Sequence, residues 1–183
     1  MRIISRYPTH GVVFAGEYYP IRTGHRTWLE FAQMIEDGSA DAILRALKLC
    51  YRGRIPYDYG AALELLCEFF IGGKSTKGER GKGKGKGKAL FSFTEDEELI
   101  YASFYSEYGI DLAQKELHWW QFLALLRGLG ENCALMRAAA IRAANPSDIK
   151  NSALRRRIIE QKRALALKND AEADVADALG AIF

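Results

Sequence analysis

The segment from residue 72 to residue 88 reads GGKSTKGERGKGKGKGK and limits what the chain can fold into. Alternating Gly and Lys cannot bury an apolar core and disfavours helix and strand, so we expect a disordered, flexible basic linker over residues 73–90. This linker would separate residues 1–72, with a hairpin and three helices, from an aromatic-rich helical half at residues 91–168. A short tail helix is expected at residues 169–183.

The N-terminal part combines one hairpin pattern with three helical patterns. Aromatic and β-branched residues flank a turn at residues 15–17, which predicts a β-hairpin. Apolar residues from Trp28 recur at helical spacing until Gly38, and a second stripe spans residues 42–51. Asp58 is placed to cap a third helix, which is apolar nearly all round and is therefore expected in the core.

Helical spacing also dominates the C-terminal part. Thr94 with Glu97 forms a capping-box pattern, and Gly109 should end the helix that follows. A second helix is expected over residues 116–127, with apolar residues around its circumference, and a third over residues 132–143. The chain is therefore predicted to be mostly α, a helical bundle with a small N-terminal β-hairpin.

Two more helices are expected toward the end of the chain. One should begin at Pro146, since proline is favoured at the first helical position, and run to about residue 168. The tail helix from Asp170 places Val175, Leu179 and Ile182 on one stripe. Because that stripe needs a partner, we expect it to bind within the chain or to a neighbouring copy.

Residues that could carry chemistry are sparse. The three cysteines form no C-x-x-C pair and the three histidines are isolated, which predicts free thiols and neither a metal nor another cofactor. Residues 73–75 resemble the end of a phosphate-binding loop, but Glu68 stands where the first glycine is required. No nucleophile or carboxylate lies at a recognisable spacing from His118. We therefore expect a binding protein, not an enzyme.

Membrane insertion is not indicated by any segment. The longest apolar stretch, residues 117–129, is interrupted by polar residues and is shorter than the ~20 residues of a membrane-spanning helix. The N-terminus has no apolar run typical of a signal peptide. We expect a cytosolic protein without membrane contact.

Basic residues suggest an alternative function, nucleic-acid binding. Seven basic residues and one acid lie between residues 72 and 88, and such a run can bind phosphate without sequence preference. It holds no aromatic residue for base stacking, so a solubilising or charge-balancing role is the simpler interpretation. The candidate contacts for phosphate or an acidic partner are Lys82, Lys84, Lys86, Lys88, Arg155, Arg156 and Arg157.

Aromatic residues are concentrated between residues 101 and 122. Tyrosine and tryptophan are common anchors of protein interfaces, although packing in the core is the simpler role for any one of them. The candidate partner-binding residues are Tyr101, Phe104, Tyr105, Tyr108, Trp119, Trp120 and Phe122.

The stretch from residue 93 to residue 129 resembles the phage "gene product fifteen" family of long-tailed phages and prophages. Looser similarity extends over roughly residues 11 to 160. The residues that match the family pattern are Asp96, Ile100, Tyr101, Phe104, Tyr108, Gly109, Ile110, Asp111, Leu112, Leu117, His118, Trp119, Trp120, Phe122, Leu125, Gly128 and Leu129.

This resemblance implies a tail assembly chaperone without catalytic residues. The family's genes lie close to the tape-measure gene, and a tape-measure protein is a long, largely helical chain that must stay soluble until the tail tube encloses it. A chaperone for it would act in the host cytoplasm through apolar grooves, form homo-oligomers, contact other tail assembly proteins, and be nearly absent from the virion. The alternatives are a minor structural component of the tail and a nucleic-acid-binding protein.

Overall fold

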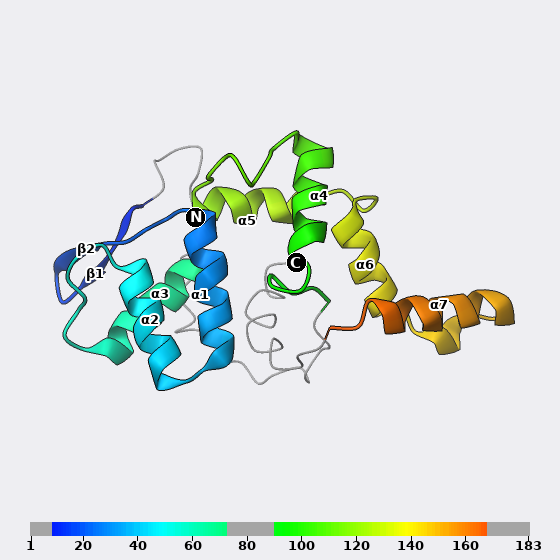
Figure 1. Cartoon of the computed structure of the whole chain (residues 1–183), viewed down its shortest axis with the longest axis horizontal. Helices are drawn as coiled ribbons and strands as arrows, with labels where there is room; N and C mark the ends of the chain where they lie inside the picture. Colours follow the sequence, from blue (N-terminus) through cyan, green and yellow to red (C-terminus); the bar gives the residue numbers. More distant parts are fainter. Residues whose placement is uncertain (1–8, 73–89, 168–183) are drawn as a thin grey trace. The chain divides into compact units, whose positions relative to one another are not determined.

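The computed structural model describes residues 9–72 and 90–167 (Figure 1). Within these residues the chain is mostly α-helical and contains one two-stranded antiparallel sheet, as predicted. The chain divides into two compact units that are interleaved in sequence. The described part of the first unit is residues 9–72 and 112–127, and that of the second is residues 90–111 and 128–167.

This division differs from the boundary expected at the Gly-Lys run. The sequence predicts one helical half over residues 91–168, whereas residues 112–127 belong to the first unit together with the N-terminal elements. Except for Leu90, the predicted linker over residues 73–90 lies outside the described residues, and so does the tail at residues 169–183.

The first unit begins with a hairpin made of β1 (Gly11–Phe14) and β2 (Glu17–Pro20). Ala15 and Gly16 form its two-residue turn with φ angles of 49° and 81°. Positive φ at both turn residues is the condition for the turn type that matches the twist of a hairpin. The turn is one residue shorter than predicted, because Glu17 already pairs with β1.

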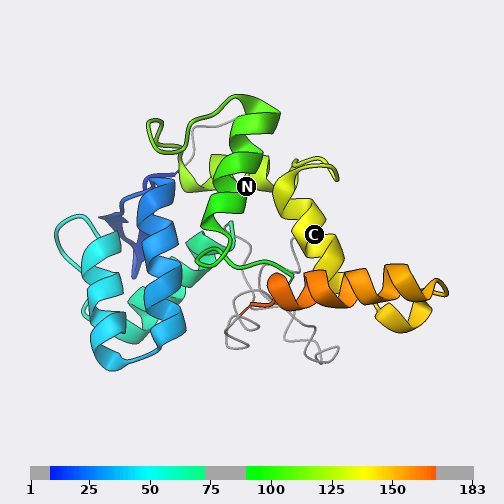
Figure 2. The same ribbon diagram turned by 45° about the vertical axis from the view of Figure 1, so that its right-hand side comes forward.

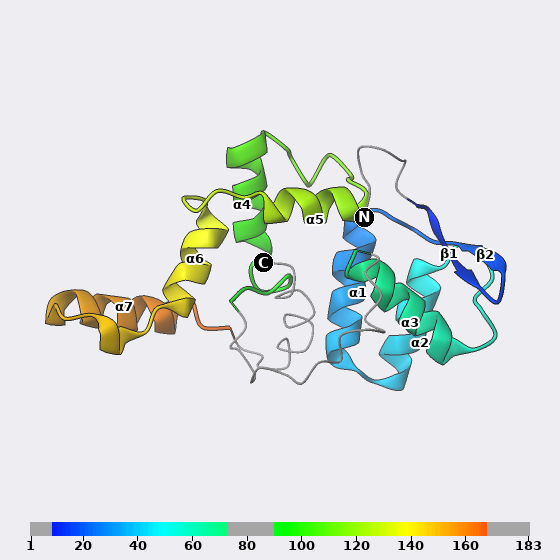
Figure 3. The same cartoon turned by 180° about the vertical axis from the view of Figure 1, so that it is seen from behind.

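Three helices follow the hairpin: α1 (His25–Asp37), α2 (Ala40–Cys50) and α3 (Tyr59–Phe70). α1 lies alongside α2, and α3 contacts both α2 and β1 (Figure 3). Gly38 ends α1 with a φ of 65°, and the Asp58 side chain accepts a backbone hydrogen bond at the start of α3, so both predicted helix ends are confirmed.

α5 (Trp119–Arg127) completes the first unit and contacts α1. The helix predicted over residues 116–127 starts three residues later, because the chain before it pairs with the segment that precedes α1. The carbonyl of Leu117 accepts a hydrogen bond from the His25 N–H at 2.8 Å. The first N–H of α5 donates to the carbonyl of Thr23 at 2.7 Å.

An aromatic cluster forms the core of the first unit. The ring of Trp28 stacks on Phe69 with centroids 4.7 Å apart, and Trp119 stacks on Phe70 at 5.0 Å and on Phe122 at 5.3 Å. Each such ring buries on the order of 200 Å², so the cluster dominates the packing of α1, α3 and α5.

The second unit contains α4 (Glu97–Tyr108), α6 (Ala134–Ala143), a short 3-10 helix η2 (Pro146–Asp148) and α7 (Ser152–Ala164). α4 packs on α6, and both α6 and η2 contact α7 (Figure 2). The single helix predicted from Pro146 onward is interrupted, because Asn151 caps a new helix.

The capping box predicted at the start of α4 is wrong. Asp96, not Thr94, is the N-cap residue, and its side chain makes no capping hydrogen bond. Its carboxylate binds Arg142 instead, which is a contact across 46 residues of sequence. The predicted end of α4 is confirmed, since Gly109 adopts a left-handed φ of 62°.

Candidate partner-binding surface

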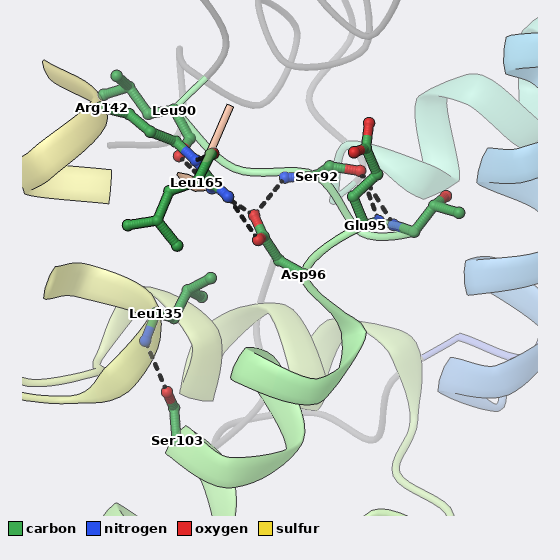
Figure 4. Close-up of polar contacts among 9 residues, drawn as sticks. Leu90, Ser92, Glu95, Asp96, Ser103, Leu135, Arg142 and Leu165 are labelled. Carbon is green, nitrogen blue, oxygen red and sulfur yellow. Dashed lines mark hydrogen bonds and ion pairs between the residues drawn. The ribbon is translucent and has the colours of Figure 1, made fainter. Parts of the chain in front are cut away.

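A buried ion pair fixes the start of α4 (Figure 4). The two terminal nitrogens of Arg142 lie 2.5 Å and 2.7 Å from the two carboxylate oxygens of Asp96, and these side chains are only 7% and 2% exposed. Arg142 also donates to the carbonyls of Leu165 at 2.7 Å and Leu90 at 3.0 Å. One guanidinium therefore joins the start of α4 to α6 and to the end of α7.

The inner face of α4 packs against α6. Ile100 and Phe104 are buried on this face. The hydroxyl of Ser103 donates to the carbonyl of Leu99 at 2.7 Å and accepts from the Leu135 N–H at 3.1 Å, near the start of α6 (Figure 4). These contacts leave the opposite face of α4 to solvent.

Two tyrosines lie on the outer face of α4. Tyr101 and Tyr105 are 38% and 57% exposed, and their rings are nearly parallel with centroids 6.3 Å apart. The Tyr101 hydroxyl donates to Asp111 Oδ1 at 3.4 Å. Desolvation and the Asp111 carboxylate raise the pKa of Tyr101, so its hydroxyl remains a donor at neutral pH.

Acidic side chains surround these tyrosines. Between residues 90 and 111 the chain has six acidic residues and no Lys or Arg, and the only ion pair of Arg142 among the described residues is with the buried Asp96. We define the tyrosine face as Tyr101 and Tyr105 together with Glu97 and Glu98, which are exposed and share their side of the helix. This surface suits a partner that carries apolar and basic side chains.

The first unit exposes a second aromatic surface. Val13 and Tyr18 face each other across the hairpin and are 60% and 53% exposed, whereas Tyr19, next along β2, is buried. We call Val13 and Tyr18 the hairpin surface. The hairpin surface was not predicted from the sequence, although the alternation of faces along a strand places Tyr18 and Tyr19 on opposite sides.

The predicted partner-binding residues separate into three groups. Tyr101 and Tyr105 are exposed, and Tyr108 and Trp120 are half-buried. The other three predicted residues are fully enclosed in the two cores and offer no surface to a partner, which corrects the prediction for Phe104, Trp119 and Phe122.

The two adjacent tryptophans hold the end of α3. The indole N–H of Trp119 donates to the carbonyl of Phe70 at 2.7 Å, and that of Trp120 donates to Phe69 at 2.9 Å. The last carbonyls of a helix lack partners within the helix. The tryptophans supply these partners, together with the Gly72 N–H, which also donates to the carbonyl of Phe69. Their role in the described structure is therefore architectural.

Two histidines, His25 and His118, make further hydrogen bonds to the backbone at the start of α5 and just before it. Nδ1 of His118 accepts from the Trp120 N–H at 3.1 Å, so Nε2 carries the proton and donates to the Thr9 carbonyl at 3.0 Å. Nδ1 of His25 accepts from the Leu117 N–H at 3.2 Å. Burial lowers the pKa of both imidazoles, which favours the neutral form that these bonds require.

The predicted basic contacts are spread over α7 and the Gly-Lys run. Arg155 donates to the carbonyl of Ile149 from two guanidinium nitrogens, at 2.9 Å and 2.7 Å, and Arg156 and Arg157 are exposed. The remaining residues of that prediction lie outside the described residues: Lys82, Lys84, Lys86 and Lys88.

Neither a cluster of metal-binding side chains nor a membrane-spanning helix occurs among the described residues. Across residues 9–72 and 90–167, no three His, Cys, Asp or Glu side chains are grouped so as to hold a metal ion. Within those ranges, no helix has the length and apolarity needed to cross a membrane. The three cysteines are free, and burial raises the pKa of the Cys50 and Cys67 thiols.

The fold and its surfaces define a mostly helical protein with a small hairpin, whose exposed aromatic residues are of the kind that anchors protein–protein contacts. The chain belongs to the Bacteriophage Gp15 protein family, whose model matches residues 8–167, and it is therefore a phage protein. The resemblance found in the sequence is confirmed. No curated protein and no solved structure matches the chain.

Proposed function

We propose that this protein is a tail assembly chaperone that binds the tape-measure protein in the host cytoplasm and keeps it soluble until the tail tube forms. Its action would be binding without catalysis. Membership of the phage family supports the setting, and the tyrosine face supports the mode of action. Several copies, associating with one another and with other assembly proteins, would cover one long client.

The observation that carries the proposal is the exposed tyrosine pair on an acidic helix. Two parallel rings one helical turn apart offer an apolar strip to an amphipathic helix, which inserts its own side chains at matching spacing. Glu97 and Glu98 beside them attract basic residues at the edge of such a helix. A largely helical client with apolar stripes fits this surface.

Co-expression tests the proposal directly. The tape-measure protein of the same phage should be insoluble alone in a bacterial host and should become soluble and co-purify when this chain is present. A tape-measure protein that is equally soluble alone would refute the chaperone role. Mass spectrometry of purified particles that finds this chain in near-stoichiometric amounts would instead support a structural component of the tail.

A matched pair of variants assigns the binding to the tyrosine face. Tyr101→Ser with Tyr105→Ser should reduce the retained tape-measure protein at least about tenfold, because truncating an interface tyrosine costs ~1–2 kcal/mol. Tyr101→Phe with Tyr105→Phe keeps both rings and should retain most of the binding. Equal retention by the serine variant would exclude this face.

A further inference from the structure

α7 has an apolar stripe but no buried residue. Leu154, Ile158 and Leu165 follow one another at helical spacing, and Leu154 is 49% exposed while the other two are half-buried. α6 contacts α7 through Lys162, whose ammonium donates to the carbonyl of Arg142 at 2.6 Å. The stripe is therefore only partly covered by the rest of the second unit.

α7 also carries a strong excess of positive charge. The helix, SALRRRIIEQKRA, contains five basic residues and one acid, a net charge of +4. Arg156, Arg157 and Arg163 are exposed, and no acidic side chain among the described residues pairs with them. A matching segment would need negative charge and a stripe of apolar side chains.

The tail has this composition. Residues 170–183 read DAEADVADALGAIF, with four acidic residues and no basic one, a net charge of −4. Val175, Leu179 and Ile182 are spaced so that a helix would place them on one face. The tail lies outside the family match, which ends at residue 167.

We propose that residues 170–183 form a helix that packs on α7 of the same chain, covers its apolar stripe and pairs with Arg157 at the edge of that stripe. Five residues, 165–169, separate α7 from the tail, which is within the length that joins two antiparallel helices. A 14-residue helix and a 13-residue helix are each about 20 Å long, so the two match in length. A short connection also gives the tail a millimolar effective concentration, which favours its own α7 over that of a second copy.

Hydrogen exchange of the full chain, followed by mass spectrometry, tests this packing. The amides of residues 170–183 should exchange about three- to fivefold more slowly than in a synthetic peptide of residues 165–183, at a concentration where light scattering gives the mass of one chain. The difference should shrink at ~0.5 M salt, since exposed charge pairs are screened.

Charge reversal locates the contact. Arg157→Glu should reduce the protection, as should Asp174→Lys, and the combination of the two should restore it. The control Arg137→Glu changes one exposed residue of the same unit by the same charge and should leave the tail protected. Unchanged exchange in the α4 and α6 peptides shows that each variant is folded.

Three results would overturn the proposal. The tail could exchange as fast as the synthetic peptide. Its protection could disappear on dilution together with the mass of two chains, which would make a second copy the occupant of α7. Protection that survives both charge reversals would show that the tail binds elsewhere.

Discussion

Asp96 and Arg142 depend on each other because both side chains are almost completely buried. An ion removed from water without its partner costs several kcal/mol, whereas exchange of both partners for neutral groups costs much less. Arg142 additionally satisfies the carbonyls of Leu90 and Leu165, so its loss leaves more than one acceptor without a donor.

Replacement of Arg142 alone should therefore lower the free energy of unfolding more than replacement of both Asp96 and Arg142. We expect Arg142→Met to lower the free energy of unfolding by about 3–5 kcal/mol, and Asp96→Asn with Arg142→Met to recover part of that loss. Urea denaturation followed by far-ultraviolet circular dichroism measures both. A double variant that is less stable than Arg142→Met would contradict the burial of an unpaired carboxylate as the cause.

His25 and His118 should make stability depend on pH. Burial lowers both folded-state pKa values below the ordinary value of about 6.5, so the unfolded chain binds more protons as the pH falls. The histidine contribution to stability should be constant above about pH 7 and should decrease as the pH falls below ~6.5. Denaturation midpoints measured at intervals between pH 5 and 8 give this slope.

A variant without a titratable side chain at position 25 provides the control. His25→Asn keeps an acceptor near the position of Nδ1, facing the Leu117 N–H, but cannot be protonated in this range. The decrease of stability between about pH 7 and 5 should be smaller in this variant. An identical slope in both proteins would exclude His25 as a source of the pH dependence.

At the scale of elements, the last carbonyls of α3 accept hydrogen bonds from the indole N–H groups of Trp119 and Trp120. Trp119→Phe should lower the free energy of unfolding by ~2 kcal/mol, because the carbonyl of Phe70 would lose its buried donor. Trp120→Phe should cost less, since Trp120 is only half-buried and water can replace its N–H. Thermal unfolding followed by circular dichroism compares the two; equal costs would argue against burial as the deciding factor.

Element ends were predictable where one residue decides them. Gly38 and Gly109 adopt left-handed backbone and Asp58 caps α3, all as the sequence indicates. The start of α4 was not predictable, because the carboxylate that could cap it is bound by Arg142, 46 residues away. The start of α5 was missed for the same kind of reason, the pairing of His118 with Gly24 just before α1.

The candidate site was predicted only in part. The concentration of aromatic residues between residues 101 and 122 identified the exposed Tyr101 and Tyr105 of α4 and also the enclosed Phe104. Spacing states which residues share a side of a helix, but not which side another helix covers. The same limit applies to Trp119 on α5, because its enclosure depends on Phe70 and Trp28 from other helices.

At the scale of the whole molecule, each unit has its own exposed aromatic surface. A long client chain could contact both, in which case binding at one raises the effective concentration at the other. We expect Val13→Ser with Tyr18→Ser to weaken capture of the tape-measure protein by several-fold, and its combination with the serine variant of the tyrosine face to abolish capture.

Quantitative pull-down of the tape-measure protein measures the loss of binding in the hairpin variant and in the combined variant. Arg45→Ser with Lys48→Ser changes two exposed residues of α2 in the first unit and serves as the control for the hairpin variant. If the hairpin variant captures as much client as this control, only the tyrosine face takes part in binding.

The sequence by itself determined the helical class, the hairpin, most helix ends and the phage family, since these depend on residue spacing and local backbone preference. Only the tertiary structure decided that residues 112–127 belong to the first unit and that Arg142 forms an ion pair with Asp96. It also decided that Trp119 and Trp120 bind the last carbonyls of α3, whereas Tyr101 and Tyr105 remain exposed. Each of these outcomes depends on contacts between residues that are distant in the chain, which local preference does not encode.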